Sequence, residues 1–180
     1  MLRIPTRGLV VGASVVVTGV LAGCGGGHKS APPTTTTTSS GGSANPATSF
    51  SVANVSGVGS VLVDGKGRTV YVLTKPGTKN VPCTDASGCT GAWPDLPLPT
   101  GTSAATAGMG ADASLLSTMK ESDGETYPTY NGYLLYEYTG DSGSGQANGQ
   151  GLTSFGGTWY VLNASGTPVK SSTSGGGGGY

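Results

Sequence analysis

The stretch Val70-Tyr71-Val72-Leu73-Thr74 is repeated, in diverged form, as Leu135-Tyr136-Glu137-Tyr138-Thr139. The segments around the two Trp residues are also alike, at Gly91-Ala92-Trp93-Pro94-Asp95-Leu96 and Gly157-Thr158-Trp159-Tyr160-Val161-Leu162. The Tyr residues are 65 positions apart and the Trp residues 66, so both pairs keep nearly one register. Ordered similarity at a fixed offset indicates internal repeats. We therefore expect two diverged copies of one β unit.

Each copy has a hairpin signal just before its Tyr strand. Asn131-Gly132 in the second copy favours a type I′ turn, because both positions of that turn take positive φ. Asp64-Gly65 is the corresponding turn signal in the first copy. Between the copies, Asp112 is expected to cap a short helix whose apolar side chains face the core. The expected strands span residues 58–63, 69–73, 125–130, 133–138 and 158–162, and the expected helix turns Leu115, Leu116 and Met119 inward.

The predicted fold is mainly β, with antiparallel hairpins from two diverged repeats that share one core and at most one short helix. The core must be shared because a unit of about 50 to 60 residues buries too little apolar surface alone. Tyr71 and Tyr136 should then lie on equivalent strands related by an approximate two-fold. Trp93 and Trp159 should close corresponding ends of the core.

The N-terminus has the features of an export signal. Arg3 and Arg7 flank the start of an uncharged run at residues 8–20, which is too short to span a hydrocarbon layer of roughly 30 Å. The following Leu21-Ala22-Gly23-Cys24 matches the bacterial lipobox residue for residue. This resemblance implies cleavage before Cys24 and attachment of a diacylglyceryl group to its sulfur. We therefore expect lipidation at Cys24 and a location at the cell membrane, anchored by lipid and facing the extracytoplasmic side.

Composition divides the chain into four parts. Residues 1–23 are the expected signal peptide, and residues 24–49 are a lipidated N-terminus followed by a disordered Ser/Thr/Pro/Gly linker. Residues 50–170 are the expected duplicated β domain, and residues 171–180 a disordered Gly-rich tail. The linker is also a candidate for O-glycosylation, since stretches rich in Ser and Thr with Pro often carry it.

Cys83 and Cys89 form an even pair once Cys24 is assigned to lipid. Outside the reducing cytoplasm, two Cys in one Pro/Gly loop predict a structural disulfide. The alternative is a redox or metal pair, in which the two thiols cycle beside another exported protein.

The motifs together resemble a bacterial family of secreted repeats of unknown function, also described as lipoproteins with a Tyr-x-[Phe/Trp/Tyr]-x-x-Asp motif. Tyr136, Tyr138 and Asp141 fit that motif fully, whereas the first copy keeps only Tyr71. Similar features extend over nearly all of residues 58–166. The resemblance implies a location in the envelope and a similar fold, and it implies no reaction.

Several kinds of chemistry are not expected. The domain lacks His, since His28 lies in the linker, so a His-dependent triad has no base and a zinc site lacks ligands. Glu121, Asp123 and Glu125 could be paired carboxylates, but their spacing is more typical of a wet loop entering a strand. Residues 141–149 resemble a calcium loop only weakly, having one carboxylate.

We expect no enzyme activity, cofactor or metal. Because no block of Lys or Arg follows the signal peptide, we also expect no nucleic-acid partner.

The aromatic residues near the repeats allow two interpretations. Six aromatic residues could form a stacking platform for sugars or peptidoglycan: Tyr71, Trp93, Tyr136, Tyr138, Trp159 and Tyr160. Alternating aromatics more often fill a small core, with the phenol bonded to backbone or Asp. Asp141 is then expected to accept hydrogen bonds that fix the turn after its strand. Two function classes stay open: a non-catalytic binding or structural module with an envelope protein or glycan as ligand, and a redox or electron-transfer partner that uses Cys83 and Cys89.

Overall fold

The structure is a computed structural model that describes residues 45–81 and 83–170. The expected signal peptide, the lipidation site Cys24, nearly all of the linker and the tail lie outside the described residues. The described part is mainly β, as predicted. Its strands are β1 (Ser49–Val55), β2 (Gly59–Val63), β3 (Tyr71–Thr74), β4 (Thr106–Ala107), β5 (Leu116–Lys120), β6 (Thr126–Tyr130), β7 (Tyr133–Leu134), β8 (Thr153–Ser154) and β9 (Gly157–Val161). Its helical turns are η1 (Pro46–Thr48), η2 (Asp85–Ser87), α1 (Cys89–Ala92) and η3 (Ala113–Leu115).

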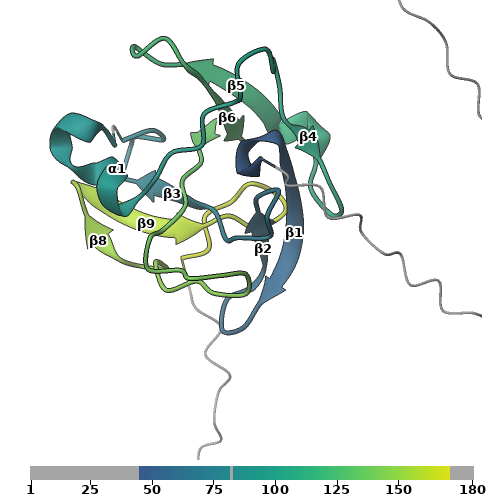
Figure 1. Ribbon diagram of the computed structural model, residues 1–180. Coiled ribbons are helices and arrows are strands. Elements are labelled where there is room, and N and C mark those ends of the chain that lie inside the picture. Colours follow the sequence, from purple (N-terminus) through teal and green to yellow (C-terminus); the bar gives the residue numbers. More distant parts are fainter. Residues whose placement is uncertain (1–44, 82, 171–180) are drawn as a thin grey trace, which may run out of the picture. The chain divides into compact units, whose positions relative to one another are not determined.

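The described strands form three small sheets, in the orders β2-β1-β4, β3-β9-β8 and β5-β6-β7. Their ladders are antiparallel, except that β1 and β4 pair in parallel. Figure 1 shows β3 of the first copy beside β9 of the second. The sheet at the centre of the repeats is therefore made by both copies.

The hairpin of the second copy forms as predicted. Asn131 and Gly132 have φ values of 49° and 76°, the positive values that a type I′ turn needs, and Tyr130 pairs with Tyr133. In the first copy, the Asp64 carboxylate accepts from the backbone of Lys66 and Arg68, which closes the turn between β2 and β3. β2 pairs only briefly with the segment before β3, through a bridge between Val63 and Thr69. Along their lengths, β2 pairs with β1 and β3 with β9.

The predicted helix after Asp112 is wrong. Asp112 does cap a turn, accepting from the backbone of Ser114 at 2.9 Å, but only the single turn η3 follows. The chain then continues as β5, which pairs with β6 from Leu116–Tyr130 to Lys120–Thr126. The strand is favoured here because its backbone N–H and C=O groups form hydrogen bonds with β6 along its whole length. A single isolated helical turn cannot satisfy its backbone groups in this way. Leu115 and Leu116 still pack against the core.

The two copies meet at Tyr71 and Tyr136, which exchange both of their backbone hydrogen bonds, at 2.8 and 3.0 Å. Such a pair in an antiparallel ladder has a local two-fold axis between its members. The pairing on either side follows this axis. In the first copy's Tyr strand, Leu73 lies opposite Trp159. In the second copy's Tyr strand, the backbone N–H groups of Glu137 and Thr139 donate to the carbonyl groups on either side of Trp93, those of Pro94 and Ala92. Each Tyr strand thus pairs with the Trp segment of the other copy.

The aromatic rings follow the same two-fold. Tyr71 meets Trp93 edge to face at 5.4 Å, and Tyr136 meets Trp159 edge to face at 5.3 Å. The two indoles stack on each other with centroids 3.8 Å apart and planes within 3°. These matched contacts support the duplication, with equivalent Trp residues in equivalent places.

The core consists of two clusters, because successive side chains of a strand point to opposite faces. Val70 and Val72 belong to one cluster, whereas Tyr71 and Leu73 belong to the other. Both clusters contain residues of both copies: the first includes Leu62, Leu135 and Leu162, and the second Val61, Tyr136 and Val161. The copies share their interior as expected, although it is divided in two by the strands that join them.

Candidate functional site

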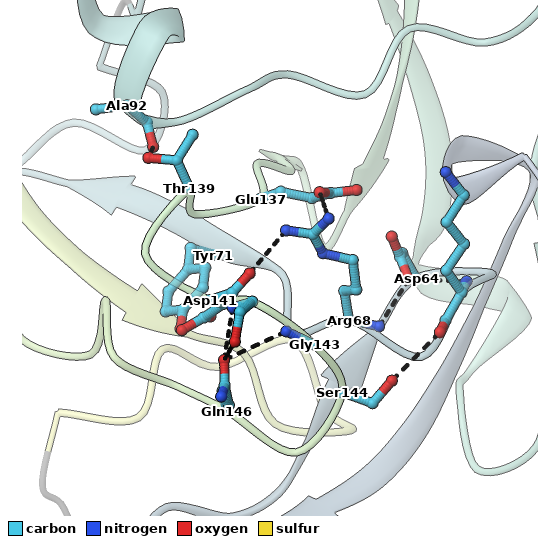
Figure 2. A network of polar contacts seen from close by, with 12 residues as sticks. Asp64, Arg68, Tyr71, Ala92, Glu137, Thr139, Asp141, Gly143, Ser144 and Gln146 are labelled. Atoms are coloured by element: carbon cyan, nitrogen blue, oxygen red, sulfur yellow. Dashed lines mark hydrogen bonds and ion pairs between the residues drawn. The ribbon is translucent and has the colours of Figure 1, made fainter.

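The family motif lies at the junction between the copies. The Tyr71 hydroxyl donates to Oδ2 of Asp141 at 2.6 Å (Figure 2). The backbone of Asn148 donates to Oδ1 of the same carboxylate at 2.9 Å. Asp141 is 2% exposed, and the Tyr71 side chain is fully buried. Burial, reinforced by the Asp141 carboxylate, raises the pKa of Tyr71 well above its usual value. Asp141 thus fixes the turn after its strand, as predicted, and its partner is the Tyr of the other copy.

A second polar contact joins the copies beside Asp141. Arg68 donates to the backbone oxygen of Asp141 at 2.9 Å and pairs with the Glu137 carboxylate at 3.2 Å (Figure 2). Burial is the main cause that raises the pKa of Glu137, and the nearby Asp64 carboxyl adds to it. Arg68 acts against this rise but does not cancel it. These groups come from the turn of one copy and the strand of the other, so they also tie the repeats together.

The remaining motif aromatics hold the Trp pair in place. Tyr136 lies against Trp159, and Tyr138 stacks on Trp93 with centroids 4.3 Å apart. Because Trp93 and Trp159 are buried at 2% and 0% exposure, they form core rather than an exposed sugar platform. This confirms the core interpretation of the two Trp residues.

Cys83 and Cys89 form a disulfide, with Cα atoms 5.2 Å apart. The separation lies within the predicted reach of about 7 Å. Both residues are buried, and the bond closes the loop that contains η2 and leads into α1. The predicted bond is confirmed, while a redox role of the pair stays a prediction.

An open cleft of about 680 Å³ lies between this disulfide loop and the hairpin of β5 and β6. Its lining contains five of the nine acidic residues of the chain and neither Lys nor Arg. Apolar side chains from Val81 and Leu134 line it as well. The acidic residues are Asp85, Asp95, Glu121, Asp123 and Glu125. This is the strongest concentration of like charge on the described residues.

The carboxylates of the cleft influence one another. Burial is the main cause that raises the pKa of Asp95, and the negative charges of Asp85, Asp123 and Glu125 raise it further. Asp123 accepts from the hydroxyl of Tyr127 at 2.6 Å and from the backbone of Glu125, so it shapes the turn between β5 and β6. The predicted wet loop before a strand is therefore present.

Tyr136 links the family motif to the cleft. The residue is 4% exposed and forms part of the cleft lining. Burial raises the pKa of Tyr136, and the charges of Asp95 and Glu121 add to the rise. The backbone bridge between Asp95 and Tyr136 brings these two residues together at the cleft. Among residues 45–81 and 83–170, no side-chain hydrogen bond involves the Tyr136 hydroxyl. The Tyr71 hydroxyl, in contrast, donates to Asp141.

Sequence reasoning found the acidic run at residues 121–125 and missed its convergence with Asp85 and Asp95. Those two residues lie in the disulfide loop and the Trp segment, and no local pattern connects them to the hairpin. The repeat offset did not supply this connection, because the pairing of Asp95 with Tyr136 is a contact between the copies and the offset relates only equivalent positions.

Comparison with known proteins gives one match. Residues 117–163 match a family described as a secreted repeat of unknown function. No curated protein and no solved structure matches the chain. Among the described residues, no helix has the length and hydropathy of a membrane span. The match runs from β5 to the end of β9 and includes Tyr136, Tyr138 and Asp141. The family whose model matches residues 117–163 is the one that the sequence motifs resemble.

Proposed function

We propose that this chain is a cell-envelope lipoprotein, anchored to the membrane through Cys24, whose β domain is a non-catalytic binding module. The lipobox at residues 21–24 and the match to a secreted repeat support the envelope location. The observation that carries the binding role is the acidic cleft, whose lining includes a buried motif residue, Tyr136.

The contrast between the two motif tyrosines supports a binding role. Tyr71 uses its hydroxyl within the fold, on Asp141. Tyr136 is its counterpart across the two-fold, yet its hydroxyl lies at a cleft lined by carboxylates. Buried polar groups are normally satisfied by the protein or by water. A hydroxyl that the fold itself does not use is therefore available to a ligand.

The polar chemistry of the domain supports a non-catalytic role. The buried Tyr71–Asp141 pair is enclosed between the copies, where a substrate has no access. The single His of the chain precedes the domain, so the cleft has no imidazole base. The cleft offers negative charge and hydrogen-bond acceptors, which suit recognition.

Anchoring is tested by Cys24→Ser, which removes the sulfur that would carry the diacylglyceryl group. In cells fed labelled fatty acid, the variant should lose the label and either leave the membrane fraction or remain uncleaved. The matched control is Ser30→Cys in the Cys24→Ser background, which restores a thiol outside the lipobox and should not restore labelling. Unchanged labelling of Cys24→Ser contradicts the anchor.

Binding is tested on the full-length, ¹⁵N-labelled chain by titration with peptidoglycan fragments and with peptides of defined charge. We expect one of these ligands to shift amides around the cleft, such as those of Thr84 and Ser122, and Tyr136→Phe to weaken that binding. Shifts confined to other faces of the domain contradict the assignment of the cleft.

A further inference from the structure

The negative charge of the cleft is not balanced by nearby positive side chains of the described residues. Within the described residues, the ion pair of Arg68 and Glu137 is the only one, and neither residue lines the cleft. The five cleft carboxylates are therefore not paired with any Lys or Arg of those residues. Like charges held close together repel, and a low-dielectric wall increases the effect. A positively charged ligand would remove this repulsion.

The five carboxylates differ in how far the fold uses them. Asp123 is bonded to Tyr127, and Asp85 accepts from the hydroxyl of Thr90. Among the described residues, no other residue donates a hydrogen bond to the carboxylates of Asp95 and Glu121, and that of Asp95 is bonded only to its own backbone. These two are also the carboxylates whose charge acts on the Tyr136 hydroxyl. Asp95, Glu121 and Tyr136 thus form the part of the cleft that is free for a ligand.

The shape of the cleft favours an extended organic cation over a metal ion. Among the described residues, no three acidic, Cys or His side chains gather closely enough to hold a metal. The charges are instead distributed over a space of about 680 Å³, between apolar patches at Val81 and Leu134. Lys and Arg side chains match this pattern, because they bury an aliphatic stem and present a charged end.

We propose that the acidic cleft binds a basic peptide segment, whose Lys or Arg side chains reach Asp95, Glu121 and the Tyr136 hydroxyl. This inference rests on the proposed binding function and names the ligand class of the same site. The partner is then a protein with an exposed run of basic residues. Its association should weaken as salt rises, since screening acts on the charges of both partners.

The test uses the full-length chain in neutral detergent and capped tetralysine as the probe. Calorimetry and ¹⁵N spectra should show one site, with shifts around the cleft. The double variant Asp95→Asn/Glu121→Gln should bind on the order of tenfold more weakly, with a smaller salt dependence. Tyr136→Phe, which keeps the ring against Trp159, should bind roughly threefold more weakly. Asp112→Asn removes an exposed carboxylate outside the cleft and should bind like the natural chain.

Three further probes separate the alternatives. Capped tetraglutamine tests peptide binding without charge, spermine offers four amines without a peptide, and calcium tests a simple ion. Each should bind at least about tenfold more weakly than tetralysine. Equal binding of spermine or calcium overturns the peptide assignment, and equal loss in Asp112→Asn overturns the site. If peptidoglycan fragments or tetraglutamine shift the cleft amides while tetralysine does not, the cationic ligand is wrong and the binding function stands. If tetralysine shifts only amides elsewhere on the domain and no other probe shifts the cleft amides, both are wrong.

Discussion

At the scale of single residues, the buried hydrogen bond from Tyr71 to Asp141 shows what the acid of the motif does: it accepts from the Tyr of the other copy. The aromatic ring fills the core against Trp93, and its hydroxyl needs an acceptor because it lies out of reach of water. Asp141 supplies that acceptor and uses its other oxygen to hold the following loop at Asn148. The first copy lacks its own Asp, since Pro76 stands at that position, and the second copy's Asp serves the first copy's Tyr.

Tyr71→Phe should destabilise the domain by about 1 to 3 kcal/mol, because it leaves an oxygen of the buried Asp141 carboxylate without its partner. The free energy of unfolding, measured in urea, checks this value. The matched control is Tyr160→Phe, on the partly exposed face of β9, which should change stability by less than about 0.5 kcal/mol. Equal effects of the two variants would contradict the structural role of the Tyr71–Asp141 bond.

Glu137 should make the stability of the domain depend on pH. The pKa of Glu137 is raised in the fold from its usual value of 4.5, chiefly by burial, so the folded chain holds this proton more tightly than the unfolded chain does. Stability from this group is complete below the unfolded pKa and is lost as pH rises through the folded one. Glu137→Gln cannot ionise, and its amide can still bond Arg68 and Asp64. The variant should therefore gain stability relative to the natural chain as pH rises from about 4 to 8.

Asp112→Asn provides a control of opposite sign. Hydrogen bonds from Ser114 lower the pKa of Asp112, so its contribution is present at high pH and lost as pH falls. The stability of the natural chain relative to Asp112→Asn should therefore increase as pH rises. The increase should be small because the Asp112 carboxylate is exposed. A pH-independent difference between the natural chain and Glu137→Gln would refute the account of Glu137.

At the scale of elements, the sequence predicted best those segments whose signal is local. The Asn131-Gly132 hairpin formed because two adjacent residues determine a type I′ turn by themselves. β1 was missed, because Ser and Asn interrupt its apolar pattern and its stability comes from β2. β5 was taken for a helix, since the capping residue Asp112 is real but the pairing with β6 is a tertiary effect.

The contribution of the disulfide between Cys83 and Cys89 to the stability of the domain can be measured. Replacing Cys83 and Cys89 together by Ala removes the closure of a short loop, which should cost about 2 kcal/mol on the chain-entropy view. Urea unfolding of the oxidised chain and of the double variant measures this cost. Ala86→Ser, in the same exposed loop, is the control and should be nearly neutral. Because both Cys are buried, the folded chain should also react slowly with a thiol reductant. Rapid, reversible reduction without loss of structure would instead favour the redox alternative.

At the scale of the whole domain, the repeat offset was the most informative part of the sequence. It led to the matched Tyr strands, because a duplication implies a two-fold that relates equivalent residues. It placed Trp93 and Trp159 at corresponding ends of the core, whereas the two indoles lie next to the axis and stack on each other. It did not predict that each Tyr strand pairs with the other copy's Trp segment. That exchange brings Asp95 to Tyr136 and so builds one wall of the cleft, which explains why the cleft was not visible in either copy alone.

The exchange also predicts that neither copy folds alone. Dividing the described domain in the exposed loop at Ser103-Ala104 gives residues 45–103 and 104–170, and each piece keeps only part of both core clusters. Neither fragment should unfold cooperatively, since each would expose the apolar surface that its partner covers. An equimolar mixture should regain the coupled circular-dichroism signal of the stacked Trp93 and Trp159, which come from different fragments.

The control for this experiment is the intact chain cleaved at the same loop after folding, which should keep that signal and a cooperative transition. Trp159→Phe in the second fragment should remove the coupled signal while still allowing association, because an apolar ring continues to fill the core. A cooperative transition in either isolated fragment would show that one copy buries enough surface by itself. The shared interior would then not be required for either copy to fold.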